Sequence, residues 1–203
     1  LIGAVNTVIN RDGKLIGHNT DGIGFFRSLA TFADFDVKDK TMTILGGGGA
    51  ATAIIAQAAL NGAKKITIFN QTPFLEQTKA YAKMISEKTG AELEVLPVED
   101  LDSIEERTAQ SQLLVNATSV GMDGESMIIK PDMTFPDHLL VADVIYQPFE
   151  TPFLAYARSK GLTALNGLGM LLFQAAEAYE AWTGVTMPTE EIWQALTETY
   201  DTH

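Results

Sequence analysis

The sequence predicts an α/β protein in which a parallel sheet carries helices on both faces. Two observations predict this fold. Apolar, β-branched segments alternate with helix-like segments along most of the 203 residues, without a repeat or a low-complexity stretch, and this alternation is typical of parallel α/β sheets. Residues 41–70 read as a strand, a glycine turn, a helix and a second strand, which together make one βαβ unit.

The glycine turn of this unit matches the pattern G-x-G-x-x-A, with Gly46, Gly48 and Ala51 in the three fixed positions. In dinucleotide-binding folds the first glycine permits a tight turn and the second lets the backbone approach a pyrophosphate. The N–H groups at the start of the helix then face the phosphates. A glycine turn without a ligand gives the same letters, but the strand before it and the helix after it favour a Rossmann-like, doubly wound sheet that binds a dinucleotide.

The end of the second strand bears on the type of dinucleotide. It reads Phe69-Asn70-Gln71-Thr72-Pro73, with no acidic residue before Glu76 and no arginine. An acidic residue near this point holds the ribose 2′-OH of NAD, whereas an arginine accommodates the 2′-phosphate of NADP. NAD and NADP both stay open, and we favour NAD because a 2′-phosphate without a nearby cation would be costly.

Before the glycine unit, the sequence predicts a hairpin and a helix. Residues 4–9 and 15–18 are short extended runs around Asp12-Gly13, which is a hairpin signal. An apolar-periodic stretch then begins at Asp21, so Thr20 or Asp21 is expected to cap a helix.

After the glycine unit, strands and helices continue to alternate. Helices are expected where apolar residues recur at helical spacing and where Gly161 or Pro188 marks an end or a start. The predicted helices are 74–89, 103–109, 149–160, 167–182 and 189–199; the predicted strands are 92–98, 112–116, 139–145 and 162–165; residues 123–137 are predicted as loop. The ends of four strands, at 46–49, 70–72, 116–121 and 146–148, are rich in small and polar residues. Since ligands of parallel sheets lie beyond the carboxyl ends of the strands, we expect one crevice there.

Composition argues against several classes of function. With 14 basic and 26 acidic residues the net charge is −12, which argues against a nucleic acid or an anionic membrane as a partner. No cysteine is present, and the three histidines are scattered, so neither a thiolate site nor a catalytic metal is expected. We find no run of 18 apolar residues and no signal peptide, and we expect a cytoplasmic protein. Because the chain opens with Leu1-Ile2-Gly3, we expect it to be the later part of a longer protein.

Several separate motifs follow one another along the chain: Gly3-Ala4-Val5-Asn6-Thr7, Asn19-Thr20-Asp21-Gly22, Gly46 to Ala51, Asn116 to Met122, Asp143 to Pro148 with Thr151-Pro152, and Asn166 to Met170 through Gln174. Taken together and in this order, they resemble the shikimate dehydrogenase family, including its quinate/shikimate branch. The resemblance implies that 3-dehydroshikimate and shikimate are interconverted by hydride transfer with NAD or NADP, a step towards chorismate and the aromatic amino acids. It allows a homodimer.

The resemblance also implies roles for individual residues. Asp21 would be catalytic, and Asn6, Tyr146 and Gln174 would contact the substrate. The cofactor would be bound by Gly46, Gly48, Gly49, Ala50, Asn70, Gln71, Thr72, Thr118, Ser119, Val120, Gly169 and Met170. Structural alternatives stay open: Asp21 as a helix start, Asn6 as an edge-strand polar group, Tyr146 as a buried aromatic, and Gln174 bonded to a neighbouring backbone.

The chain also departs from the family pattern. The N-V-T-x-P-x-K motif with the family's catalytic lysine and the earlier Ser-x-Ser motif are absent, and the family's N-R-T motif reads Asn70-Gln71-Thr72. Losing a general acid–base lysine costs roughly 10²–10⁴-fold in rate. Because the chain also lacks most of the family's N-terminal substrate domain, we expect the activity of this chain alone to be impaired.

The sequence predicts three parts. Residues 1–35 are expected to be the tail of the substrate lobe with a connecting helix, 36–165 the Rossmann-like domain, and 166–203 helices that return to that lobe. Dehydrogenation of quinate and non-catalytic nucleotide binding are the alternative functions.

Overall fold

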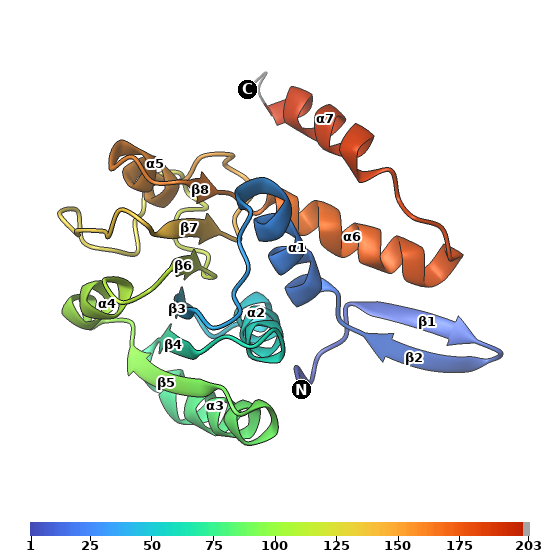
Figure 1. Cartoon of the computed structure of the whole chain (residues 1–203), viewed down its shortest axis with the longest axis horizontal. Coiled ribbons are helices and arrows are strands. Elements are labelled where there is room, and N and C mark those ends of the chain that lie inside the picture. The colour runs from blue at the N-terminus through green and yellow to red at the C-terminus, as the bar shows by residue number, and fades with distance from the viewer. Residues whose placement is uncertain (201–203) are drawn as a thin grey trace.

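The computed structural model describes residues 1–200, and it confirms the predicted parallel α/β sheet (Figure 1). The sheet has six parallel strands in the order β5-β4-β3-β6-β7-β8. Their bounds are β3 Thr41–Leu45, β4 Lys65–Asn70, β5 Glu92–Pro97, β6 Leu113–Asn116, β7 Leu140–Asp143 and β8 Ala164–Leu165. Successive strands are added outwards from β3 on one side and then from β6 on the other, which is the order of doubly wound dinucleotide-binding sheets. The order reverses between β3 and β6, the point where such sheets bind ligands.

Helices cover both faces of this sheet, as predicted. Their bounds are α1 Asp21–Ala33, α2 Gly49–Leu60, α3 Leu75–Thr89, α4 Leu101–Thr108, α5 Pro152–Ser159, α6 Leu168–Thr183 and α7 Thr189–Tyr200, with a short 3-10 turn, η1 Thr72–Phe74. Alternate strand residues point to opposite faces. Ile44 of β3 therefore joins one core with residues of α1, α2 and α3, whereas its neighbour Leu45 joins a second core with residues of α4 and α5. Figure 1 shows these helices on the two sides of the sheet.

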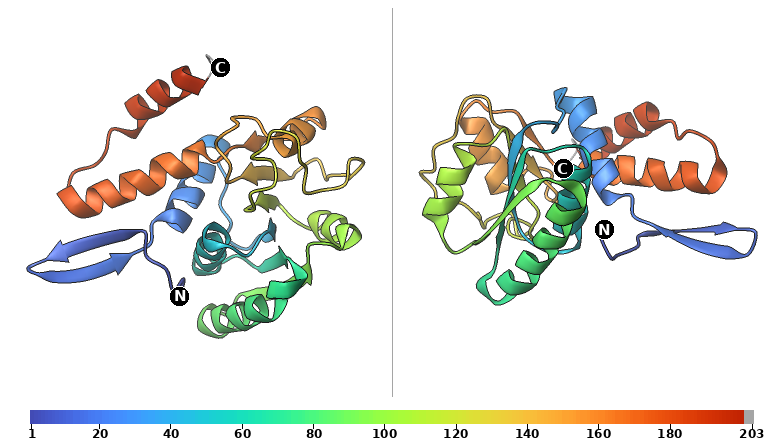
Figure 2. Two further views of the ribbon diagram at one scale, coloured as in Figure 1. Left: turned by 180° about the vertical axis from the view of Figure 1, so that it is seen from behind. Right: turned by 60° about the horizontal axis from the view of Figure 1, so that its bottom comes forward.

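The remaining segments lie beside the sheet and do not extend it. Strands β1 Thr7–Arg11 and β2 Lys14–His18 form the predicted antiparallel hairpin, whose turn holds Asp12 and Gly13 at positive φ. The hairpin projects away from the sheet in all three ribbon views (Figures 1 and 2). The indole N–H of Trp182, at the end of α6, donates to the Val8 carbonyl at 3.0 Å. The hairpin is thus tied to a helix far from it in sequence.

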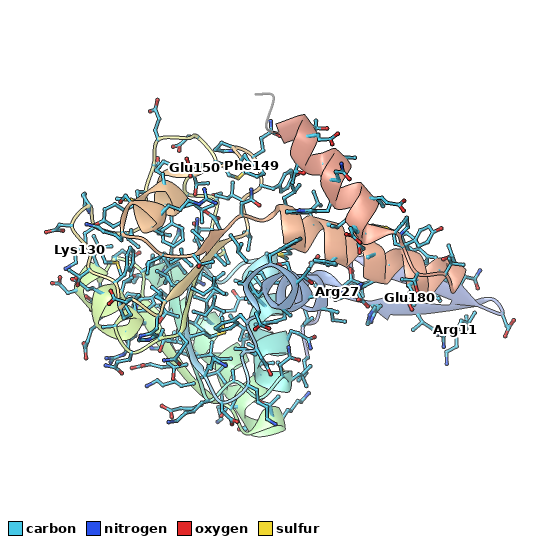
Figure 3. All side chains as sticks on the ribbon, turned by 45° about the horizontal axis from the view of Figure 1, so that its top comes forward. Arg11, Arg27, Lys130, Phe149, Glu150 and Glu180 are labelled. Atoms are coloured by element: carbon cyan, nitrogen blue, oxygen red, sulfur yellow. The ribbon has the colours of Figure 1, made fainter. Side chains whose placement is uncertain are left out.

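Helix α6 packs along α1, and α7 is held against the same pair of helices. Arg27 of α1, labelled in Figure 3, forms an ion pair with Glu177 of α6 at 2.8 Å and lies over the ring of Phe173. Trp193 of α7 stacks on Phe32 of α1 with ring centroids 4.2 Å apart. The N-terminal and C-terminal segments therefore pack on each other beside the sheet. The division of the chain into three parts, with boundaries at 35/36 and 165/166, stays a prediction.

Most predicted boundaries lie within two or three residues of the observed ones, and two C-terminal elements are shorter than predicted. The strand predicted at 139–145 ends at Asp143, and the helix predicted at 149–160 begins only at Pro152. The helix starts late because the Thr151 hydroxyl accepts the Leu154 N–H at 3.3 Å and caps it there. In the described part of the chain no helix is long and apolar enough to cross a membrane.

Candidate functional site

A cavity of about 760 Å³ opens at the carboxyl ends of β3, β4 and β6. Its lining includes the glycine turn, the residues at the end of β4 and the residues after β6, so three of the four strand ends that were predicted to share one crevice meet here. The fourth, residues 146–148, does not line this cavity. Cavities of a few hundred to 1,000 Å³ hold small ligands and cofactors. The apolar part of the lining includes Phe69, Phe74, Val98 and Ile128, which gives the cavity both an apolar wall and polar strand ends.

The glycines of the turn divide into two that the protein itself constrains and two that face open space. Gly46 has φ of 115°, and a Cβ there would lie 2.7 Å from the Ala117 carbonyl oxygen. A Cβ on Gly47 would lie 2.1 Å from the Asn70 side-chain nitrogen. Gly48 and Gly49, in contrast, have nothing within 4 Å of an added Cβ. The space in front of Gly48 is part of the cavity, so a phosphate can approach the backbone there as the motif predicts.

The segment after β4 lines the cavity with Asn70 and Gln71 but not with Thr72. The Asn70 amide donates to the Thr78 hydroxyl at 2.9 Å, and its oxygen accepts the Gln71 N–H at 2.9 Å, so this side chain holds the turn in shape. Thr72 instead donates from its N–H and its hydroxyl to the carboxylate of Glu99, at 3.2 and 3.0 Å. Glu99 lines the cavity. It was not expected from the sequence because it follows β5, the strand after the βαβ unit, and not the second strand of that unit.

The segment after β6, Thr118 to Val120, lines the cavity as predicted. Its shape comes from the buried side chain of Asn116. The Asn116 oxygen accepts from the N–H and the hydroxyl of Thr118 at 3.1 and 2.7 Å, and its amide donates to the Val120 carbonyl at 3.1 Å. The same amide donates to Asp143 on the neighbouring strand β7 at 3.1 Å.

Asp143 is almost fully buried below this loop, with 1% of its surface exposed. Its carboxylate accepts from Asn116, from the Ile145 N–H at 3.0 Å and from the Thr151 hydroxyl at 2.8 Å. Burial raises the pKa of Asp143, and the three hydrogen bonds act in the opposite direction. Asp143 and Thr151 belong to a motif of the sequence for which no role was predicted, and here they support the segment that lines the cavity.

Asn6 and Asp21, which are 15 residues apart in sequence, meet at the start of α1. The Asn6 amide donates to Asp21 Oδ1 at 2.8 Å and to the Thr20 hydroxyl at 2.9 Å, and the Asn6 oxygen accepts the Thr20 N–H at 3.0 Å. Thr20 occupies the N-cap position without a side-chain capping bond, and its hydroxyl accepts from Asn6 instead. No described residue donates to Asp21 Oδ2. One carboxylate oxygen is thus held by Asn6, and the other is free for a hydroxyl.

Gln174 of α6 packs against α1 one turn after Asp21. The contact is at Gly24, where an added Cβ would lie 2.4 Å from the Gln174 backbone nitrogen. The Gln174 amide donates to the Leu171 carbonyl at 3.0 Å, which is the neighbouring-backbone bond considered above. Tyr146 follows β7 and is 40% exposed; the alternative in which it is a buried aromatic is wrong. Its contact with a substrate stays a prediction.

Besides Thr72, four predicted cofactor residues do not line the cavity. Gly49 and Ala50 form the first turn of α2, whereas Gly169 and Met170 are buried in the first turn of α6. A Cβ on Gly169 would lie 2.9 Å from Ser28 of α1, so this glycine lets two helices approach. Among residues 1–200 no group of His, Cys, Asp and Glu is arranged to hold a metal ion.

Comparison with known proteins decides the family. Over 200 residues the chain is 72% identical to the shikimate dehydrogenase (NADP(+)) of Streptococcus mutans, covering 98% of this chain and 69% of that protein. The chain belongs to the shikimate dehydrogenase family. The family model described as "Shikimate 5'-dehydrogenase C-terminal domain" matches residues 167–197, which contain α6 and most of α7.

Solved structures of the shikimate dehydrogenase family share this fold. The shikimate 5-dehydrogenase of Listeria monocytogenes, in complex with shikimate and NAD, superposes with a TM-score of 0.90 at 44% identity, over 96% of this chain and 68% of that one. The quinate dehydrogenase of Corynebacterium glutamicum, in complex with NAD, superposes with a TM-score of 0.84 at 28% identity, over 97% and 68% of the two chains. The shikimate enzyme is the more similar of the two.

Proposed function

We propose that the protein is an NAD(P)-dependent oxidoreductase that interconverts 3-dehydroshikimate and shikimate, a step in the supply of chorismate and the aromatic amino acids. The observation that carries this proposal is the Asn6–Asp21 hydrogen bond of 2.8 Å at the start of α1, in a chain whose sheet end holds a dinucleotide-sized cavity. A module that only binds nucleotides has no need for such a pair. The family membership supports the choice of substrate.

When bound, the nicotinamide cofactor supplies the hydride chemistry, and the residues of the chain bind, orient and handle a proton. Gly46, Gly48 and Thr118 border the cavity where the pyrophosphate would lie. Asp21 Oδ2, free of protein donors among residues 1–200, would accept the hydrogen of the substrate hydroxyl, while Asn6 orients the carboxylate through Oδ1. Tyr146 and Gln174 are proposed to contact the substrate ring and its hydroxyls.

Two finer points of the proposal concern the catalytic power and the cofactor. No lysine or arginine pairs with Asp21 in the described residues. We therefore propose that the kcat of this chain alone is roughly 10²–10⁴-fold lower than that of an enzyme with the second general acid–base group. The chain offers Gln71, not an arginine, at the end of β4, which supports NAD, whereas the S. mutans relative is named for NADP(+). The homodimer and the cytoplasmic location stay predictions.

The test is nicotinamide absorbance during incubation of the protein with shikimate, and separately with quinate, plus NAD or NADP. We expect reduction with shikimate, and we expect Asp21→Asn to lower kcat by roughly 10²–10⁴-fold while leaving cofactor affinity unchanged. Asp12→Asn is the matched control, because it removes the same charge from the exposed hairpin turn, where φ is 53° and Asn is tolerated. Equal turnover of Asp21→Asn and Asp12→Asn would refute the role of Asp21. Faster turnover with quinate would favour the quinate function.

A further inference from the structure

Glu99 lies two residues after the end of β5, at the carboxyl edge of the sheet. The Val98 N–H donates to the Asn70 carbonyl at 2.9 Å, which continues the β4–β5 pairing and brings Glu99 beside the turn that follows β4. There the Glu99 carboxylate accepts the N–H of Thr72 at 3.2 Å and its hydroxyl at 3.0 Å, one bond to each oxygen. Glu99 of the β5 strand end therefore brings a carboxylate next to the turn after β4, where dinucleotide-binding folds usually carry an acidic residue at the end of their second strand.

The charge of Glu99 is not neutralised by a neighbour. Its own backbone N–H and that of Thr72 lower the pKa of Glu99, so the carboxylate is ionised at neutral pH. No Lys or Arg forms an ion pair with Glu99 within residues 1–200, and Lys79, on the first part of α3, is paired with Glu76 at 2.8 Å. The cavity wall next to Gln71 thus carries a fixed negative charge.

The carboxylate also keeps acceptor capacity. An ionised carboxylate offers about four lone-pair sites, and Thr72 uses one on each oxygen. A ribose with a free 2′-OH can donate to such a group and gain a charge-assisted hydrogen bond. A 2′-phosphate in the same place has no hydrogen to donate and would face a like charge, which disfavours its charged form.

We propose that Glu99 is the residue that selects a dinucleotide with a free 2′-OH, NAD, against its 2′-phosphorylated counterpart, NADP. This inference rests on the proposed cofactor site, and it goes against the NADP(+) in the name of the S. mutans relative. The selection acts through both a hydrogen bond to the ribose and repulsion of the phosphate.

The experiment measures the dissociation constants of NAD and NADP by titration calorimetry on the protein, on Glu99→Gln and on Glu87→Gln. Gln keeps the shape of Glu99 and can still accept from Thr72. The control removes the same charge from the exposed face of α3, where Glu87 is outside the cavity lining. We expect the dissociation constant of NADP to be at least about tenfold larger than that of NAD. Glu99→Gln should reduce this ratio by about tenfold, because it removes one charged hydrogen bond to the ribose and one repulsion of the phosphate. Glu87→Gln should leave the ratio unchanged.

Salt provides a second readout. The NADP affinity should rise relative to NAD as salt screens the repulsion, and this dependence should weaken in Glu99→Gln. Equal or tighter binding of NADP by the unmodified protein would overturn the inference, as would the same ratio in Glu99→Gln and Glu87→Gln. If turnover of shikimate continues in either of those cases, the proposed function stands without this inference. If neither dinucleotide binds, both fall.

Discussion

At the scale of single residues, the buried carboxylate of Asp143 is held by a network of hydrogen bonds. It receives hydrogen bonds from three donors on three separate segments, namely Asn116, the Ile145 N–H and Thr151. A buried charge is stable only when it is hydrogen-bonded in this way. Through Asn116, the same carboxylate holds the Thr118–Val120 segment that lines the cavity, so one residue links the stability of the sheet end to the shape of the site.

Replacing Asp143 tests this link. Asp143→Ala leaves buried donors unpaired and should lower the free energy of unfolding by about 1–3 kcal/mol for each donor that water does not reach. Asp143→Asn keeps an acceptor oxygen and should be milder. Urea unfolding of both variants measures the difference. An Asp143→Ala variant as stable as the unmodified protein would show that the network contributes nothing.

The pH dependence follows from the raised pKa of Asp143. The unfolded carboxyl titrates at its ordinary value of 3.8, and the folded one at a higher pH because of burial. The native state therefore binds more protons in that window, so the contribution of Asp143 is complete below the unfolded pKa and is lost as pH rises through the folded pKa. The stability of the unmodified protein relative to Asp143→Asn should accordingly fall as the pH rises from about 4.

At the scale of elements, α1 is positioned by two glycines that let helices approach it on two sides. A Cβ on Gly22 would lie 2.4 Å from the Ala53 carbonyl oxygen of α2, and a Cβ on Gly24 would lie 2.4 Å from the Gln174 nitrogen of α6. Both contacts are with backbone atoms, which cannot move aside as a side-chain tip can. Because Asp21 begins α1 and Gln174 lies on α6, Gly24 determines how closely these two proposed site residues approach each other.

Gly24→Ala should separate α1 from α6 and destabilise the protein by about 1–3 kcal/mol, the usual cost of overpacking. Thermal unfolding measures the loss. Gly49→Ala is the control, since it makes the same change in a helix where an added Cβ meets nothing within 4 Å. If the two variants are equally stable, the close approach of the helices is not important for stability.

At the scale of the whole molecule, cofactor binding and folding are linked, because the cavity exists only where the ends of β3, β4 and β6 meet in the folded sheet. NAD at 100 times its dissociation constant should stabilise the protein by about 2.7 kcal/mol. For a chain of this size that corresponds to a rise in Tm of about 5–10 °C.

Gly48→Ala should reduce this rise in Tm, because the added methyl group fills the space left open for the phosphates. Without cofactor, the variant should lose no more than about 1 kcal/mol of unfolding free energy, the cost of an alanine at the N-cap of α2. Scanning fluorimetry with and without NAD measures both effects. An undiminished shift in Gly48→Ala would place the cofactor elsewhere.

The sequence by itself determined the elements and the glycine turn. Periodicity, turn residues and the strand–glycine–helix pattern are local properties, so they predicted the parallel sheet, the hairpin and the crevice at the strand ends. The same local reasoning placed Gly48 and Thr118 at the cavity, where the structure has them.

Only the tertiary structure decided which distant side chains meet. The register that pairs Asn116 with Asp143, the closure that brings Asn6 to Asp21 and the crossover that carries Glu99 to Thr72 each join segments 15 to 27 residues apart. Such contacts depend on how strands and helices are stacked, and the stacking is decided by burial of the whole core, which no local pattern encodes. For that reason an acidic side chain beside the end of β4 is seen only in the folded sheet, where β5 lies next to β4 and brings Glu99 to Thr72.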